Sequence, residues 1–279
     1  MRKIHVQNIT DAVKDAVMNA NFELDEDILR ALRDVKEKEV SVLGRDILMK
    51  LIENAAIAKK EKIPLCQDTG LVVIFVEMGQ DVMLVGGDFY TALEEGVRQG
   101  YREGFLRKSV CHPFTRKNTG DNTPVIIHLD VVPGNDLKIW VMPKGGGSEN
   151  MSRLFMLSPS AGWDGVKEKI VQAVIDAGSN PCPPTILGVG IGGNFEQCAI
   201  LSKKALLRPL GTSNPDPEID SMEQELLEAV NKTGVGPQGL GGSTTSLAAH
   251  ILMMPCHIAS LPVALNIQCH SSRHVRIDF

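Results

Sequence analysis

Aromatic residues are scarce in this 279-residue chain, where two Trp, two Tyr and eight Phe amount to 4%. Base-stacking nucleic-acid modules need exposed aromatic side chains, so this scarcity argues against them. The chain also lacks a basic excess, because 29 Lys and Arg stand against 34 Asp and Glu, for a formal net charge of -5. Such a balance does not attract nucleic acid or an anionic membrane. We therefore expect neither of these partners.

Long hydrophobic runs are missing as well. No stretch reaches about 18 apolar residues, and the start, MRKIHVQNIT, has no apolar run of signal-peptide length. These absences favour a soluble, cytoplasmic protein. In that reducing compartment the six cysteines are not expected to form disulfides, so each is a buried residue, a ligand or a reactive thiol. Because no C-x-x-C pair occurs, a zinc ribbon or a thioredoxin-type redox site is not expected.

Hydrophobic periodicity predicts one mixed α/β domain over residues 1–279, with a helical segment at 1–62 that covers a mixed sheet or sheets built from 63–279. Helices are predicted around 9–20, after Asp25, and around 47–56. A buried strand is predicted at 71–78, and a helix that begins at Asp88 follows it. A long polar loop at 105–123 precedes a predicted hairpin of 124–132 and 136–143, and KGGGSEN is predicted as a loop. Further elements are a helix at 166–177, a short strand TILGV, helices around 199–206 and 223–230, and strand-like runs in the tail.

The cysteines fall into different settings. Three lie in irregular, turn- or proline-rich segments, namely Cys66, Cys182 and Cys269. Three thiolates fit one metal or cluster with a coordination position left open, although single cysteines are often inert. Cys198 lies within a predicted helix and is interpreted as a core residue. Cys111 and Cys256 each precede a histidine, but adjacent side chains rarely face each other, so a thiol–histidine pair is the weaker interpretation.

Two glycine-rich segments allow more than one interpretation. GVGIGG at 188–193 matches the dinucleotide pattern G-x-G-x-x-G between a strand and a helix, but no acidic residue ends a second strand about 20 positions later. A dinucleotide-binding module therefore stays as an alternative function of a different class. KGGGS at 144–148 is not a phosphate loop, since its lysine precedes the glycines. It is either a flexible turn or a place where backbone N–H groups approach a ligand such as a carboxylate.

Five motifs occur in a family's order: LCQDTG, KGGGSEN, NPCPPTILGVGIGG, GLGGSTT and CHIASLPVALNIQCHSSRH. They resemble the alpha subunit, or N-terminal domain, of class I iron–sulfur fumarate hydratases, and equally L-tartrate dehydratase alpha subunits. The resemblance implies a 4Fe-4S cluster held by Cys66, Cys182 and Cys269. An open cluster iron would act as a Lewis acid in the reversible hydration of fumarate to (S)-malate. Dehydration of L-tartrate is the alternative reaction.

The same resemblance implies roles for residues beside these ligands. Gln67 and Asp68 are expected to contact the dicarboxylate substrate, with Asp68 as an acid/base or hydroxyl-orienting group; a turn aspartate is the structural alternative. Arg107 matches a substrate-binding arginine, and Gly146 a backbone contact to substrate. His257 matches the family's active-site histidine, and a buried structural histidine is the alternative.

The resemblance also implies a partner. Single-chain members of the family continue into a second domain, whereas this sequence ends at Phe279. We therefore expect this chain to be the alpha half of a two-subunit enzyme whose beta subunit completes the pocket. Family members dimerise, which makes a heterotetramer the expected assembly.

Overall fold

The computed structural model describes residues 2–279, which divide into two compact units. Unit 1 comprises the chain up to Leu24, Ala55–Gly146 and Arg273–Phe279, and unit 2 comprises Asp25–Asn54 and Gly147–Ser272. The chain passes between the units several times, which explains why no linker marks a boundary in the sequence. The single domain expected over 1–279 stays a prediction. The buried apolar side chains of the chain form two separate cores.

Unit 1 contains a four-stranded sheet in the order β10-β5-β2-β4. Its strands are β2 (Leu71–Gly79), β4 (Ile126–Val132), β5 (Leu137–Lys144) and β10 (Val275–Asp278). The predicted hairpin of 124–132 and 136–143 is wrong, because β2 lies between β4 and β5, parallel to β4 and antiparallel to β5. The physical reason is that β2 is the most buried strand of this sheet apart from β5, so pairing on both edges satisfies its backbone away from water.

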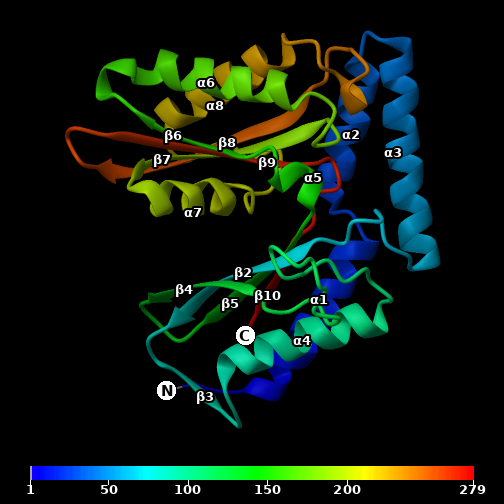
Figure 1. Ribbon diagram of the computed structural model, residues 1–279, viewed down its shortest axis with the longest axis vertical. Helices are drawn as coiled ribbons and strands as arrows, with labels where there is room; N and C mark the ends of the chain where they lie inside the picture. Colours follow the sequence, from blue (N-terminus) through cyan, green and yellow to red (C-terminus); the bar gives the residue numbers. More distant parts are fainter. Residues whose placement is uncertain (1) are drawn as a thin grey trace. The chain divides into compact units, whose positions relative to one another are not determined.

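Helices α1 (Val6–Phe22) and α4 (Phe89–Glu103) pack against each other in unit 1 (Figure 1). Both were predicted, and α4 begins as expected after Asp88, whose carboxylate accepts a hydrogen bond from the Thr91 N–H at 2.7 Å. The segment before α1 is not helical: β1 (Arg2–His5) pairs in parallel with β3 (Val82–Val85). Apolar side chains of α1, α4, β2 and β5 form one core.

Unit 2 contains the sheet β6-β9-β7-β8, in which β7 pairs in parallel with β8 and antiparallel with β9. Its strands are β6 (Arg153–Leu157), β7 (Thr185–Gly193), β8 (Ser246–Cys256) and β9 (Leu261–Gln268). Figure 1 shows α6 (Gly162–Ala177) and α8 (Pro217–Asn231) over one face of this sheet and α7 (Phe195–Ala205) over the other. The remaining helices are α2 (Glu26–Lys38), α3 (Val42–Glu61), α5 (Gly146–Glu149) and the 3-10 turns Pro159–Ala161 and Pro237–Gly239.

Glycine-rich segments differ from their predicted structures. KGGGSEN is not wholly a loop, because its residues 146–149 form α5. GVGIGG lies inside β7 rather than at a turn after a short strand. A Cβ at Gly188 would lie 2.0 Å from the carbonyl oxygen of Ser202, and one at Gly190 equally close to that of Cys198, both on α7. These two glycines therefore let α7 approach β7 closely, a packing role that accounts for them without a dinucleotide.

The predicted mixed α/β class is confirmed. Helix α1 contacts β5 and β10 in unit 1, and α2 contacts β8 in unit 2, so the helical N-terminal segment covers a sheet in each unit. Across residues 2–279, no helix combines the length and apolar composition needed to cross a membrane.

Candidate active site

The predicted site residues are distributed over both units. Unit 1 holds Cys66, Gln67, Asp68, Arg107 and Gly146, and unit 2 holds Cys182, His257 and Cys269. None of the six cysteines forms a disulfide. Within residues 2–279, no three His, Cys, Asp or Glu side chains are grouped so that they could hold a single metal ion.

In unit 1, the turn between α3 and β2 presents Asp68 in a defined orientation. One carboxylate oxygen, Oδ1, accepts the Gly70 N–H at 2.9 Å, and the other, Oδ2, accepts the Gly146 N–H at 2.7 Å. The structure thus brings Asp68 and Gly146 into direct contact. Gly70 has a φ of +77°, and a Cβ there would lie 2.7 Å from the Lys144 backbone, so only glycine lets β5 pass this close.

Buried polar side chains donate hydrogen bonds to the backbone of this turn. Arg273 is 2% exposed, and its Nη1 donates to the Asp68 carbonyl at 2.8 Å and to Asn21 Oδ1 at 3.0 Å. The Tyr101 hydroxyl lies 2.6 Å from the Thr69 carbonyl, to which it donates, and burial raises the pKa of this phenol above its ordinary value. Arg273 and Tyr101 therefore fix the backbone of the turn that carries the Asp68 side chain.

Arg107 is linked to the same turn through its backbone. Its carbonyl accepts a hydrogen bond from Thr69 Oγ1 at 2.7 Å, while its side chain is exposed. The predicted polar loop at 105–123 contains no helix or strand, but it is held in place: Asn122 Oδ1 accepts the Ser109 N–H at 2.6 Å, and its Nδ2 donates to the Gly70 carbonyl at 3.2 Å. The loop thus presents the Arg107 guanidinium to solvent from a fixed backbone.

In unit 2, Cys182 and Cys269 lie at the same end of the sheet, because Cys182 precedes β7 and Cys269 follows its antiparallel neighbour β9. Cys182 is exposed, with a φ of +54°, and Cys269 is half-buried. The ring Nδ1 of His270 lies 2.9 Å from the Cys182 carbonyl, which joins the two cysteine loops directly. The fold therefore positions these two predicted ligands together.

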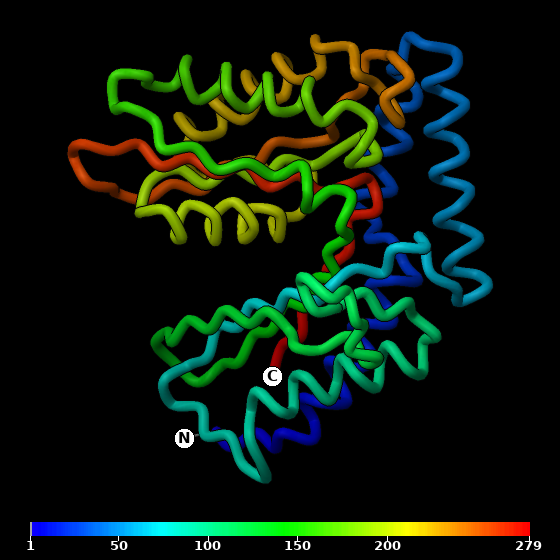
Figure 2. The backbone as a smooth tube through the Cα atoms, viewed as in Figure 1, coloured from blue at the N-terminus to red at the C-terminus, as the bar shows by residue number. Residues whose placement is uncertain are grey.

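His257 lies at the opposite end of this sheet, in the turn between β8 and β9. Strand β8 has 11 residues, which corresponds to roughly 33 Å at about 3.3 Å per residue. Figure 2 shows the β8–β9 turn at one end of the sheet and the chain leaving β9 at the other. The His257 side chain is exposed and lines an apolar pocket of about 370 Å³ with Trp163, Met222 and Ile258. Within one chain, His257 and the cysteine pair do not share a site.

The remaining cysteines do not form histidine pairs. Cys198 is fully buried in α7, as expected, and burial raises the pKa of its thiol. The Cys256 thiol donates to the Ser260 carbonyl at 3.2 Å, whereas His257 Nδ1 accepts the Ala259 N–H at 3.1 Å. Cys111 pairs through its backbone with Asn118 in an isolated bridge.

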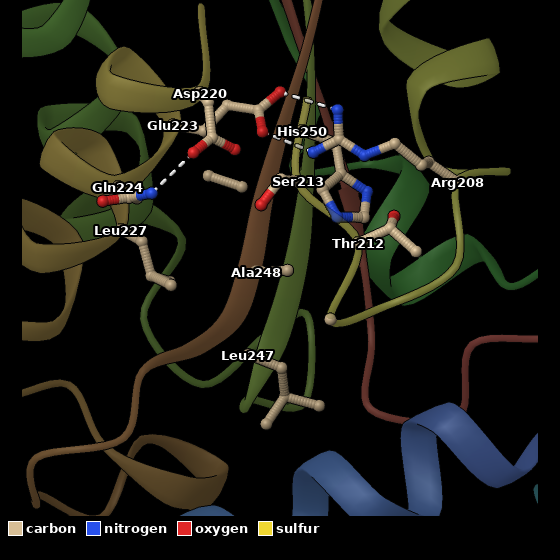
Figure 3. A pocket seen from close by; sticks show the side chains of 12 residues that line it. Arg208, Thr212, Ser213, Asp220, Glu223, Gln224, Leu227, Leu247, Ala248 and His250 are labelled. Atoms are coloured by element: carbon tan, nitrogen blue, oxygen red, sulfur yellow. Dashed lines mark hydrogen bonds and ion pairs between the residues drawn. The ribbon is translucent and has the colours of Figure 1, made fainter. Parts of the chain in front are cut away.

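A second polar cluster lies outside the predicted site, beside the free edge of β8 (Figure 3). Arg208 forms a bidentate ion pair with the buried carboxylate of Glu223, and His250 lies next to the guanidinium. These side chains line a pocket of about 270 Å³. Glu223 Oε1 also accepts the Ile251 N–H of β8 at 2.7 Å, so the cluster satisfies the open strand edge.

His250 in this cluster is expected to make the free energy of unfolding depend on pH. Burial, reinforced by the Arg208 charge, lowers the pKa of His250 to about 4. The unfolded chain therefore binds this proton more readily than the folded chain, and the stabilisation present above about pH 6.5 is lost as the pH falls towards 4. We expect urea denaturation to show a loss of about 3 kcal/mol over this range that is absent from His250→Asn.

Asp25 has the opposite pH dependence, since burial and then Asp27 raise its pKa to about 6. It therefore favours the folded state at the acidic end of the same interval. The difference between wild type and His250→Asn cancels this contribution, because Asp25 is present in both. Parallel pH profiles for the two proteins would contradict the assignment to His250.

Sequence reasoning missed the residues that support the site. Arg273 and His270 both lie in the motif CHSSRH, and a charged or aromatic polar residue that follows a predicted cysteine ligand was a usable signal for them. Tyr101 carried a weaker signal, a polar-tipped aromatic at the end of an amphipathic helix. Gln238, whose side-chain Nε2 donates to the Pro183 carbonyl at 2.8 Å, carried no signal, because nothing local in GPQGLGG marks a side chain that reaches another loop.

Known proteins are similar to this chain over almost its whole length. The family model described as fumarate hydratase (Fumerase) matches residues 10–278. The chain is 41% identical over 273 residues to a Methanocaldococcus jannaschii protein named "Putative L(+)-tartrate dehydratase subunit alpha", with 95% of each chain covered. It is 33% identical over 273 residues to an L(+)-tartrate dehydratase subunit alpha of Escherichia coli, with 96% of this chain and 89% of that one covered.

Proposed function

The chain belongs to the fumarate hydratase (Fumerase) family of iron–sulfur hydro-lyases, and we propose that it is the alpha subunit of an L(+)-tartrate dehydratase. The choice of substrate rests on one observation: the chain matches relatives named for that activity over almost the full length of both chains. Dehydration of L(+)-tartrate, expected as the alternative reaction, thus becomes the first candidate. Hydration of fumarate to (S)-malate is the second candidate, favoured by the name of the family model.

The donor set fits a 4Fe-4S cluster. Cys66, Cys182 and Cys269 form no disulfide, lie outside helices and strands, and are at least partly exposed. Cluster thiolates bind different irons, so they need not be close enough to share one metal ion. We propose these three cysteines as the ligands. When bound, the cluster would supply an open iron as a Lewis acid for the substrate's hydroxyl.

The side chains of unit 1 suit the dicarboxylate. Asp68 has both oxygens fixed by backbone N–H groups, so it can accept a hydrogen bond from, or hold a proton for, a substrate hydroxyl without moving. The exposed Arg107 guanidinium can bind a carboxylate in a bidentate manner. Gln67, also exposed, and the Gly146 backbone complete the proposed substrate contacts.

His257 requires a second copy of the chain in this scheme. Because it lies at the far end of β8 from the cysteine pair of its own unit, it would reach a substrate only at another copy's cluster. The expected dimer supplies such a copy. Its exposure and its apolar surroundings are compatible with burial in a contact between subunits.

The relatives' names, subunit alpha, support a beta partner for this chain too. The test is to produce the chain alone and together with its candidate beta subunit, reconstitute both anaerobically with iron and sulfide, and measure turnover of L(+)-tartrate, D-tartrate and (S)-malate. We expect a brown protein, little activity for the chain alone, and a kcat/KM for L(+)-tartrate that exceeds that for malate by about tenfold or more in the complex.

Other outcomes would change the assignment. A preference for malate would favour fumarate hydratase, and full activity of the chain alone would contradict the need for a beta subunit. A colourless anaerobic protein that binds a dinucleotide would overturn the hydro-lyase proposal altogether.

A further inference from the structure

Gln238 contacts the Cys182 loop through both its backbone and its side chain. Its backbone N–H and its side-chain Nε2 each donate to the Pro183 carbonyl at 2.8 Å. The residue belongs to the 3-10 turn Pro237–Gly239 and has a φ of +52°, a left-handed conformation that is uncommon for glutamine. The turn is thus shaped so that one side chain makes a double contact with the residue after a proposed ligand.

His270, which directly follows the proposed ligand Cys269, contacts the same loop. Its Nδ1 lies 2.9 Å from the Cys182 carbonyl, and because a carbonyl only accepts, Nδ1 carries the proton and donates it. The same Nδ1 lies 3.3 Å from Gln238 Nε2, so the two side chains touch. Since His270 directly follows Cys269, one residue links the backbones of both cysteine loops.

Close packing fixes the distance between these segments. A Cβ at Gly239 would lie 2.5 Å from the Cβ of Ser179, so the turn that carries Gln238 is pressed against the start of the Cys182 loop. Cys182 itself has a φ of +54°, a left-handed conformation that a non-glycine residue keeps only where the surroundings enforce it. Its neighbours Pro181 and Pro183 have no N–H with which to stabilise the loop.

We propose that Gln238 and His270 are positioning residues that hold the Cys182 and Cys269 loops in their ligating arrangement before a cluster binds. The effect of these residues on cluster binding rests on the proposed function. Their effect on the two loops does not, because the loops are held in this arrangement without a cluster. Residues that orient ligands in this way typically change metal affinity about 10–100-fold when they are removed. Neither side chain needs to touch the substrate or the iron.

Isosteric variants test the geometry rather than the mere presence of a side chain. His270→Asn places an amide N–H near the position of Nδ1, whereas His270→Gln places it near the position of Nε2. Gln238→Ala removes the side-chain donor to Pro183, and Gln224→Ala, on an exposed face of α8, is the matched control. All are made in the full chain together with the candidate beta subunit.

Two measurements are compared. In the metal-free protein, we expect amide hydrogen exchange at 179–184 and 269–272 to accelerate in His270→Gln and Gln238→Ala, and to stay near the wild-type rate in His270→Asn and Gln224→Ala. In the reconstituted protein, we expect a chelator to remove iron about 10–100-fold faster from the first two variants.

Unchanged exchange in His270→Gln and Gln238→Ala would overturn the proposal, whether or not a cluster is present. Equal acceleration in His270→Asn and His270→Gln would also overturn it, since the position of the donor would then be irrelevant. A wild-type protein that takes up no cluster would refute the proposed function alone, because the exchange experiment uses metal-free protein.

Discussion

Replacing Glu223 by alanine is expected to lower the free energy of unfolding by about 3–5 kcal/mol, because it leaves a guanidinium on a side chain that is only 20% exposed without its counter-ion. Glu223 is 5% exposed, and its carboxylate binds both terminal nitrogens of Arg208. Arg208 Nε is already buried without a partner among the described residues. Removing the carboxylate would therefore leave both terminal nitrogens without this acceptor, beside an Nε that already lacks one.

The same substitution exposes the edge of a sheet. Glu223 Oε1 accepts the Ile251 N–H of β8 and the Asn214 side-chain N–H, and Asn214 in turn donates to the Ile251 carbonyl at 3.3 Å. Because β8 is the last strand of its sheet, these side chains replace a missing neighbouring strand. We expect the Ile251 amide to lose its protection from hydrogen exchange in Glu223→Ala.

Glu225 provides the matched control on the same helix. Its side chain is 48% exposed and forms a surface pair with Lys167 and a hydrogen bond from the Trp163 indole. Exposed pairs contribute little, so Glu225→Ala should leave the urea midpoint close to that of the wild type. Urea denaturation followed by circular dichroism measures both variants. Similar losses for the two would show that burial of the Arg208 pair is not the source of the effect.

Replacing Asp68 by asparagine is expected to lower kcat by about 10²–10⁴-fold while cluster content stays at the wild-type level. The carboxylate accepts two backbone N–H groups, one on each oxygen. Asparagine has a single side-chain oxygen, and its NH₂ would face the second N–H, so the side chain must rotate or lose a partner. In addition, an amide cannot take up a proton as the proposed acid/base group would.

Asp88→Asn is the control for this charge change. Asp88 also accepts a backbone N–H in unit 1, but asparagine caps a helix about as well as aspartate does. We expect its turnover and its iron content to match the wild type. If Asp68→Asn loses iron along with activity, the residue supports the cluster rather than the chemistry. If it retains full turnover, Asp68 is a turn aspartate with no catalytic role.

Local periodicity was enough to predict most helices. The apolar faces of α1, α4, α6 and α8 recur every three to four residues, and the capping residues Asp88 and Gly178 lie where those patterns begin and end. These signals depend on neighbours in the sequence, so they survive without knowledge of the fold. Four-residue elements such as β1 and α5 were missed because they are too short to carry a period.

Strand pairing could not be derived in the same way. The turn at 133–136 between β4 and β5 has the composition of a hairpin turn, yet both strands pair with β2, more than 50 residues earlier in the chain. Burial of β2 between β4 and β5 outweighs the tendency of the turn at 133–136 to pair the two strands that it joins. Likewise, the spacing of GVGIGG suggested a phosphate-binding turn, whereas Gly188 and Gly190 serve the contact between β7 and α7.

Residue types at fixed spacings predict most of the helices, the mixed α/β class and, through five ordered motifs, the family and its candidate ligands. These are local properties of the sequence. The fold, by contrast, shows that the chain forms two separate cores, that Asp68 bonds to Gly146, that Gln238 and His270 join two cysteine loops, and that His257 lies at the other end of their sheet. Each of those facts depends on which distant strands pair and which loops then meet, a choice made by long-range burial rather than by any short stretch of residues.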